Sequence, residues 1–272
     1  MKIDLETIRE RNFCIDPNYK VNRQLKYDDR SIDVQSGTVW QPNVYQYASS
    51  LASKLHLNSI IDFGCGSGDK LSVFAGKFSV TGFDFGSNLK ICQQKFPQFE
   101  FRQHDFESED DFPIPRDLGS QSLLICADVI EHLIDPSILL GKLRTLLEVA
   151  PILLLSTPDR SKVDAPPLGP PLNPRHIREW TLTELEDLAR AFGFQILDSG
   201  NTLTNDQEPY WSTSLLVLAG EGFPKGKKIP TNSRYCSKNT LRPWVNTQLY
   251  RIANKGRMAA SKLSTDSSKT GD

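Results

Sequence analysis

The stretch from Ile60 to Lys70 most constrains what this chain can fold into. An apolar run ends there at Asp62, and glycines occupy positions 64, 66 and 68 before a helical pattern begins. Glycine is needed where the backbone takes a positive φ or where a ligand lies against bare main chain. The free N–H groups at the start of a helix suit an anionic ligand. The stretch therefore predicts a strand, a ligand-binding turn and a helix.

The spacing of these glycines separates two kinds of nucleotide site. The dinucleotide fingerprint G-x-G-x-x-G has its third glycine where this chain has Asp69, which disfavours a nicotinamide cofactor. The sequence D-F-G-C-G-S-G resembles instead the first motif of the class I S-adenosylmethionine (SAM) methyltransferases. The resemblance implies an α/β fold, with a doubly wound, mostly parallel seven-stranded sheet and helices on both faces. It also implies that SAM is bound by Asp62, Gly64, Cys65, Gly66 and Gly68.

A second acid follows the next predicted strand, residues 79–83. Asp84 lies 22 residues after Asp62, and an acid at the end of the second strand of such a unit binds the ribose hydroxyls. The alternative is a surface aspartate that closes the strand. Because the glycine turn precedes it, we expect Asp84 to bind the ribose, with Phe85 beside it in the cofactor site.

A third, short strand is predicted at residues 99–101, where apolar and charged residues alternate. In the resembling family an acid after this strand bonds the adenine amino group, and the next residue packs on the ring. The resemblance assigns these roles to Asp105 and Phe106. The acidic residues at 107–111 have no histidine spaced with them, so we expect a solvated loop and no metal site.

An unbroken apolar run at residues 122–127 predicts a strand that is buried on both faces. The sequence D-V-I-E-H follows it, and it resembles the fourth motif of the same superfamily. This motif lies far from the glycine turn along the chain, so it supports the resemblance independently. It implies that Asp128 and Val129 belong to the cofactor site.

A proline-rich segment follows the fifth predicted strand, residues 152–155, with six prolines between positions 158 and 175. Such a segment forms neither a helix nor a central strand, and we expect it to wall the acceptor side of the site. The sequence N-P-R-H-I-R-E-W after it resembles a stretch found in a branch of bacterial methyltransferases near surface-glycan and small-molecule pathways. We expect the acceptor to be bound by Arg178, Glu179 and Trp180. Strands at 194–197 and 212–218 complete the predicted sheet.

Two of the four histidines fall on segments expected to face the transferred methyl group, His132 and His176. Histidine titrates near neutrality, so either is a candidate general base. For each histidine a structural role is the alternative to the general-base role. The alternative for His132 is a backbone hydrogen bond that fixes its loop, and the alternative for His176 is packing beside Trp180, where it would orient Arg178.

Composition and charge divide the chain into an N-terminal arm (1–41), a methyltransferase domain (42–220) and a basic C-terminal extension (221–272). The extension holds eleven Lys/Arg and three Asp/Glu, a balance of +8, whereas residues 1–220 balance −9. An acidic surface is a poor nucleic-acid partner. Trp40, Gln41 and Tyr45 belong either to core packing at a helix start or to an arm that folds over the cofactor. The extension is either a solvated tail or a docking segment.

The five cysteines show no ligand spacing, and the N-terminal residues carry no apolar signal-peptide core, so we expect a reducing, cytoplasmic setting. The favoured function is methyl transfer from SAM to a small-molecule or sugar acceptor, at oxygen. One alternative is methylation of nitrogen, carbon or a macromolecule. Another is a non-catalytic protein that binds SAM or a nucleotide. The sequence specifies neither the acceptor nor the oligomeric state.

Overall fold

The computed structural model describes residues 4–22, 39–163, 166–205, 210–224, 226, 229 and 235–237. The predicted C-terminal extension therefore lies outside the described residues from residue 238 on. Among the described residues, no helix combines the length and the apolar character needed to cross a bilayer.

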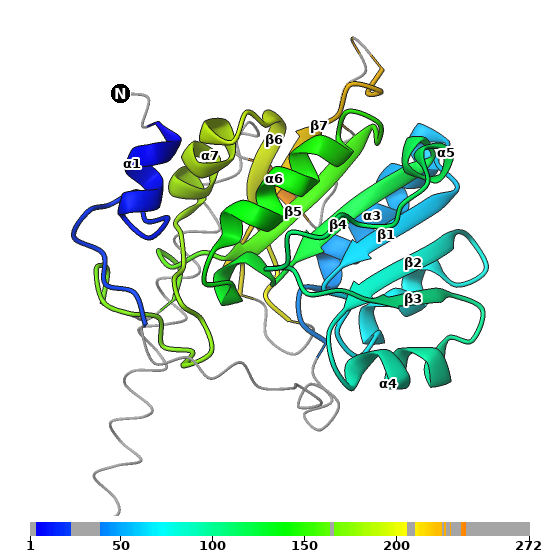
Figure 1. Cartoon of the computed structure of the whole chain (residues 1–272), viewed down its shortest axis with the longest axis horizontal. Helices are drawn as coiled ribbons and strands as arrows, with labels where there is room; N and C mark the ends of the chain where they lie inside the picture. Colours follow the sequence, from blue (N-terminus) through cyan, green and yellow to red (C-terminus); the bar gives the residue numbers. More distant parts are fainter. Residues whose placement is uncertain are drawn as a thin grey trace, which may run out of the picture. The chain divides into compact units, whose positions relative to one another are not determined.

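The described strands form one sheet with helices on both faces (Figure 1). The strands are β1 Ser59–Phe63, β2 Ser79–Asp84, β3 Glu100–Gln103, β4 Ser122–Ala127, β5 Ile152–Pro158, β6 Gln195–Thr202, β7 Thr213–Ala219 and β8 Tyr235–Ser237. Their order is β3-β2-β1-β4-β5-β7-β6-β8. The first five strands pair in parallel, and β7 runs antiparallel to β5 and β6. The predicted doubly wound, mostly parallel sheet is confirmed.

The eighth strand is an addition to the seven that the sequence predicts. β8 lies in the segment assigned to the basic extension, and its backbone pairs antiparallel with β6, from Thr202↔Tyr235 to Gly200↔Ser237. Without β8, the outer edge of β6 would present unpaired N–H and C=O groups. Three residues are too few to display the alternation by which a strand is recognised in sequence.

Helices cover both faces of the sheet (Figure 1). The described helices are α1 Leu5–Glu10, α3 Pro42–Leu55, α4 Asn88–Lys95, α5 Arg116–Ser120, α6 Pro136–Leu146 and α7 Leu182–Ala191, with 3₁₀ turns η1 Asp69–Phe74 and η2 Ile130–His132. Alternate residues of β4 contribute to two separate cores. Leu124 and Cys126 pack in the cluster that contains α1, α6 and α7, whereas Leu123 and Ile125 pack in the cluster that contains α3. This alternation follows from the period of two along a strand.

Side-chain caps fix where two helices near the site begin. Asp135 accepts a hydrogen bond from the backbone N–H of Ser137 at 2.8 Å, and Pro136 is the first residue of α6. Thr181 and Glu184 form a capping box at the start of α7. The cap of α6 fixes the end of the segment that follows β4, and the cap of α7 fixes the end of the segment that follows the prolines.

Candidate active site

A cavity with a volume of about 310 Å³ lies at the carboxyl ends of the parallel strands, where open α/β sheets bind ligands. Most of the predicted site residues line it. They are Gly64, Cys65, Gly66, Gly68, Asp84, Phe85, Phe106, Asp128, Val129, His132 and His176. The other predicted residues are not part of its lining. These are Asp62, Asp105, Arg178, Glu179 and Trp180.

The three glycines of the turn after β1 all adopt positive φ, at +87° for Gly64, +56° for Gly66 and +78° for Gly68. A Cβ at Gly64 would lie 2.3 Å from Cγ2 of Val129, so this position also requires close approach of two segments. A Cβ at Gly66 would meet no atom within 4 Å. Gly66 therefore presents bare main chain to the cavity.

Asp84 joins the end of β2 to the glycine turn. Its Oδ2 accepts a hydrogen bond from the Gly66 N–H at 2.6 Å, and its Oδ1 accepts one from the Phe85 N–H at 2.7 Å. Burial raises the pKa of Asp84 above its ordinary value, although these N–H groups act in the opposite direction. The carboxylate is thus fixed beside the turn at the edge of the cavity.

Asp62 is fully buried at the end of β1 and lies behind the turn rather than in the cavity lining. The Tyr45 hydroxyl, from α3, lies 3.2 and 3.1 Å from its two carboxylate oxygens and donates to them. Burial raises the pKa of Asp62 to about 7. Asp62 therefore links β1 to α3.

The two residues predicted to bind adenine lie differently. Phe106 is buried and lines the cavity. Asp105 is exposed, and its carboxylate accepts a hydrogen bond from the Glu107 N–H at 2.9 Å. In this arrangement Phe106 faces the cavity, and Asp105 shapes the loop after β3.

Gln41 ties the segment before α3 to the ends of β4 and β5. Its side-chain amide donates to Asp128, and its amide oxygen accepts a hydrogen bond from the Ser156 hydroxyl. Its backbone N–H donates to the Thr204 carbonyl at 2.7 Å. Asp128 has the left-handed φ of 57°, which aspartate tolerates better than most residues. Val39, Trp40 and Gln41 line the cavity, so this segment forms part of the wall of the predicted cofactor site.

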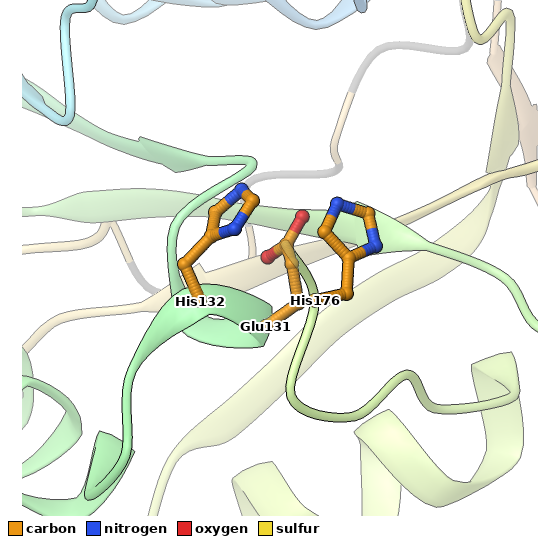
Figure 2. Close-up of side chains that lie close together, drawn as sticks. All are labelled: Glu131, His132 and His176. Atoms are coloured by element: carbon orange, nitrogen blue, oxygen red, sulfur yellow. The ribbon is translucent and has the colours of Figure 1, made fainter. Parts of the chain in front are cut away.

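A cluster of one acid and two histidines lies next to the cavity, whose lining includes both histidines (Figure 2). One ligand atom each of Glu131, His132 and His176 can be chosen so that all lie within 4.8 Å of one another. The two imidazole rings meet edge to face with centroids 4.7 Å apart. Glu131 and His132 belong to η2, whereas His176 follows the proline-rich segment. The two candidate bases therefore come together.

Burial raises the pKa of Glu131 well above its ordinary value, and the nearby Asp128 adds to the effect. Each histidine ring has an oxygen next to Nδ1. His132 Nδ1 lies 3.0 Å from the Arg175 carbonyl, and His176 Nδ1 lies 2.5 Å from Oε1 of Glu179. The backbone hydrogen bond that was the alternative role of His132 is present, with Nδ1 facing the Arg175 carbonyl.

The predicted acceptor-binding residues pack outside the cavity lining. The Arg178 guanidinium is buried and donates to the carbonyls of Leu133 and Ile134 at 2.8 and 3.0 Å. Burial lowers its pKa to about 10. The Trp180 indole N–H donates to the Phe13 carbonyl at 2.7 Å. Arg178 and Trp180 thus hold neighbouring segments, and Glu179 contacts His176.

Sequence reasoning missed several polar residues that line the cavity. They are Ser67, Asp69, Lys70, Asn88, Asn173, Arg175, Thr204 and Thr213. Lys70 follows the glycine turn and Asn88 follows the loop after Asp84. Their proximity to these two predicted cofactor-binding loops could therefore have indicated that they line the site. Thr204 and Thr213 flank the β6–β7 connection and carry no motif, and only the sheet order brings them to this edge.

The sheet order, the glycine turn after β1 and the cavity at the strand ends define a Rossmann-like cofactor-binding fold. A family described as methyltransferase domain matches residues 20–199. The chain belongs to this methyltransferase-domain family. The resemblance to class I methyltransferases drawn from the glycine turn and from D-V-I-E-H is thereby confirmed.

Curated relatives carry names that agree with this family. A protein of Mycolicibacterium smegmatis named a probable S-adenosylmethionine-dependent methyltransferase is 28% identical over 158 residues, which is 57% of this chain and 58% of that protein. A similarly named protein of Mycobacterium tuberculosis is 27% identical over 154 residues, 56% of this chain and 53% of its own length. The chain thus spans somewhat over half the length of the curated relatives it matches.

Among solved structures, a S-adenosylmethionine-dependent methyltransferase from Clostridium acetobutylicum shares the fold. The TM-score is 0.50 at 11% identity, over 68% of this chain and 94% of that one. At that identity the likeness concerns the fold alone.

Proposed function

We propose that this chain transfers a methyl group from SAM to a small-molecule or sugar acceptor, at an oxygen atom. The observation that carries the proposal is that one cavity joins the glycine turn and Asp84 to the histidines His132 and His176. The family membership and the names of the curated relatives support SAM as the methyl donor.

The residues at the glycine-turn side fit SAM by their chemistry. Gly66 leaves open space where a side chain would stand, and a carboxylate such as Asp84 suits ribose hydroxyls. Phe106 offers a buried apolar surface for a flat ring. We propose that these residues hold SAM, together with Asp128 and Val129.

SAM supplies an electrophilic methyl carbon attached to a sulfonium. The chain's task is to align the acceptor, and alignment alone contributes about 7–11 kcal/mol to barrier reduction. A hydroxyl acceptor must also lose a proton. His132 and His176 are the candidate bases, and general-base help contributes roughly 10²–10⁴-fold. Arg175 and Asn173, on the same side of the cavity, are proposed to contact the acceptor.

The four described thiols, Cys14, Cys65, Cys92 and Cys126, are all buried and form no disulfide. They support the proposed reducing, cytoplasmic setting. Methylation of nitrogen, carbon or a macromolecule remains the alternative within the enzyme class.

Calorimetry with SAM tests the cofactor part of the proposal. Asp84→Ala should bind SAM about 10- to 100-fold more weakly, because a charge-assisted hydrogen bond is worth about 1.5–3 kcal/mol. Asp117→Ala is the matched control, since Asp117 is exposed on α5 and does not line the cavity. Equal SAM affinity in folded Asp84→Ala would overturn the ribose role.

Mass spectrometry of an acceptor panel with methyl-labelled SAM tests the reaction. A gain of one labelled methyl group on a hydroxyl compound is the expected result. Label on an amine, a carbon or a macromolecule would favour the alternative within the enzyme class. SAM binding without transfer to any member of a broad panel would favour the non-catalytic alternative.

A further inference from the structure

Glu131 carries a buried carboxyl group to which the proposed methyl transfer assigns no role. It is fully buried, and neither of its carboxylate oxygens makes a well-aligned hydrogen bond to a described residue, although the Thr157 hydroxyl is near enough to lower its pKa. Native proteins rarely leave buried polar atoms unsatisfied, and an unpaired buried carboxylate is strongly disfavoured. A positively charged ligand that enters between Glu131 and its neighbours would supply the missing partner.

The two histidines next to Glu131 are oriented as metal ligands usually are. His132 Nδ1 lies 3.0 Å from the Arg175 carbonyl oxygen, and His176 Nδ1 lies 2.5 Å from a Glu179 carboxylate oxygen. Both oxygens are hydrogen-bond acceptors, so in the neutral form of each ring they favour the tautomer with its proton on Nδ1 and its lone pair on Nε2. A carbonyl or carboxylate behind the ring is the usual support of a metal-ligating histidine.

We propose that Glu131, His132 and His176 bind one divalent transition-metal cation beside the cavity. Two imidazole nitrogens and one carboxylate oxygen suit first-row cations and leave coordination positions open. In the view of Figure 2 the Glu131 carboxylate appears between the two rings, and one candidate ligand atom of each residue, with either ring nitrogen allowed for the histidines, lies within 4.8 Å of the other two.

Cation binding requires a modest closing of this cluster. Metal–ligand distances of about 2.0–2.2 Å place neighbouring ligand atoms nearer to each other than 4.8 Å, so the side chains must approach. The Asn173 side-chain nitrogen lies 2.9 Å from His176 Nε2. That amide has to turn away, because it occupies the lone pair that the cation needs. Both movements involve side chains at the cavity wall.

The role of the cation rests on the proposed function, whereas its binding does not. His132 and His176 line the cavity, so the open coordination positions can take the acceptor oxygen. A bound cation lowers the pKa of a coordinated hydroxyl. The hydroxyl proton goes to water, the oxygen electron pair forms the bond to the methyl carbon, and the carbon–sulfur pair stays on sulfur as a thioether. A ligating histidine cannot also accept the proton, so the cation replaces the general base.

Titration of the metal-stripped full chain with Co²⁺, without SAM, tests the site. Visible d–d bands should grow to one Co²⁺ per chain. Glu131→Gln, His132→Ala and His176→Ala should each weaken Co²⁺ binding at least tenfold. His56→Asn is the matched control and should bind like the parent. His56 is exposed at the end of α3 with a left-handed φ of 60°, which asparagine accepts.

If a variant fails to fold, nuclear magnetic resonance of the unsubstituted chain can still show which histidines bind Co²⁺. Paramagnetic Co²⁺ should shift the imidazole resonances of His132 and His176 much further than those of His56 and His104. A parent that binds no Co²⁺, or binds it equally after all three substitutions, would overturn the site. The site would also be overturned if His56→Asn weakened Co²⁺ binding as much as the three ligand substitutions do.

SAM calorimetry on the same samples separates the two proposals. A protein that binds SAM but not Co²⁺ keeps the proposed function and loses the metal site. A protein that binds Co²⁺ but not SAM loses the proposed function alone. A chelator should abolish methyl transfer, and unchanged turnover in its presence would overturn the catalytic role of the cation.

Discussion

Asp62 carries a carboxyl group that is buried more deeply than its position in a cofactor motif would suggest. Its pKa is raised from 3.8 to about 7 by burial, while Lys70 and the Tyr45 hydroxyl act to lower it and Asp84 to raise it. The folded chain therefore keeps this proton at a pH where the unfolded chain has released it. Its contribution to stability falls as the pH rises from about 4 to about 7 and is then constant.

We expect Asp62→Asn to gain stability relative to the parent as the pH rises. Asparagine keeps an acceptor for the Tyr45 hydroxyl and has no proton to lose. Between about pH 5 and about pH 7.5, the difference in the free energy of unfolding should move in favour of the variant by about 2 kcal/mol. Urea denaturation of both proteins without SAM measures it. A difference that does not vary with pH would show that Asp62 titrates normally.

Arg178 and Arg175 lie three residues apart, and we expect the first to stabilise the fold and the second to contact the acceptor. Arg178 is buried against two carbonyls and lies over the Phe13 ring at 5.6 Å, whereas Arg175 lines the cavity. Arg178→Ala should lower the free energy of unfolding by about 2–4 kcal/mol, because it leaves buried carbonyls unpaired. Arg175→Ala should change it by less than about 0.5 kcal/mol and raise the KM for the acceptor. The reverse pattern in denaturation and kinetics would restore Arg178 to the acceptor site.

At the scale of the elements, the glycine turn after β1 needs close packing at Gly64 and open space for a ligand at Gly66, and substitution at each position tests one of these needs. Gly64→Ala sets a Cβ 2.3 Å from Val129 and should destabilise the fold by more than about 2 kcal/mol. Gly66→Ala meets no atom within 4 Å, so only its left-handed φ opposes it, by about 1–2 kcal/mol. Its methyl group nevertheless enters the space proposed for SAM. Calorimetry should find SAM affinity reduced at least tenfold, and parent-like affinity would remove SAM from this turn.

The sequence predicts well those elements whose signals are local. The strands β1, β2 and β4 are mainly apolar segments with an acid at or next to their last residue, and the α7 capping box is a four-residue signature. The position of Gln41 is different, because glutamine has no preference that would direct it to Asp128 and Ser156. The same holds for Glu131 and His176, which only the folded sheet brings together.

Errors in the predicted site have a common physical origin. Arg178 and Trp180 lie in the motif N-P-R-H-I-R-E-W, and a motif does not say which of its side chains faces the cavity. His176 faces it, while Arg178 and Trp180 pack against the N-terminal segment through Phe13. That segment has poor periodicity, so its contact with the motif could not be anticipated.

For the whole molecule, the boundary of the folded domain can be tested by shortening the chain. Residues 1–237 retain β8 and should unfold at the temperature of the full chain. Residues 1–224 lose the pairs from Thr202↔Tyr235 to Gly200↔Ser237 and should be less stable by about 1–2 kcal/mol, yet still fold and bind SAM. Thermal unfolding followed by circular dichroism measures both. If residues 1–224 are unfolded, the predicted boundary at 220 is wrong.

The contacts of Gln41 also govern when the site can exist during folding. Its partners Asp128 and Ser156 lie 87 and 115 residues further along the chain. Contacts of such long range form late, since the chain must first close large loops. A nascent chain that lacks β5 has the glycine turn and Asp128, but it lacks Ser156 and Thr204, the other two partners of Gln41. We therefore expect the site to be complete only after β5 and the β6–β7 connection have joined the sheet, so that ligand binding would report on completion of the fold.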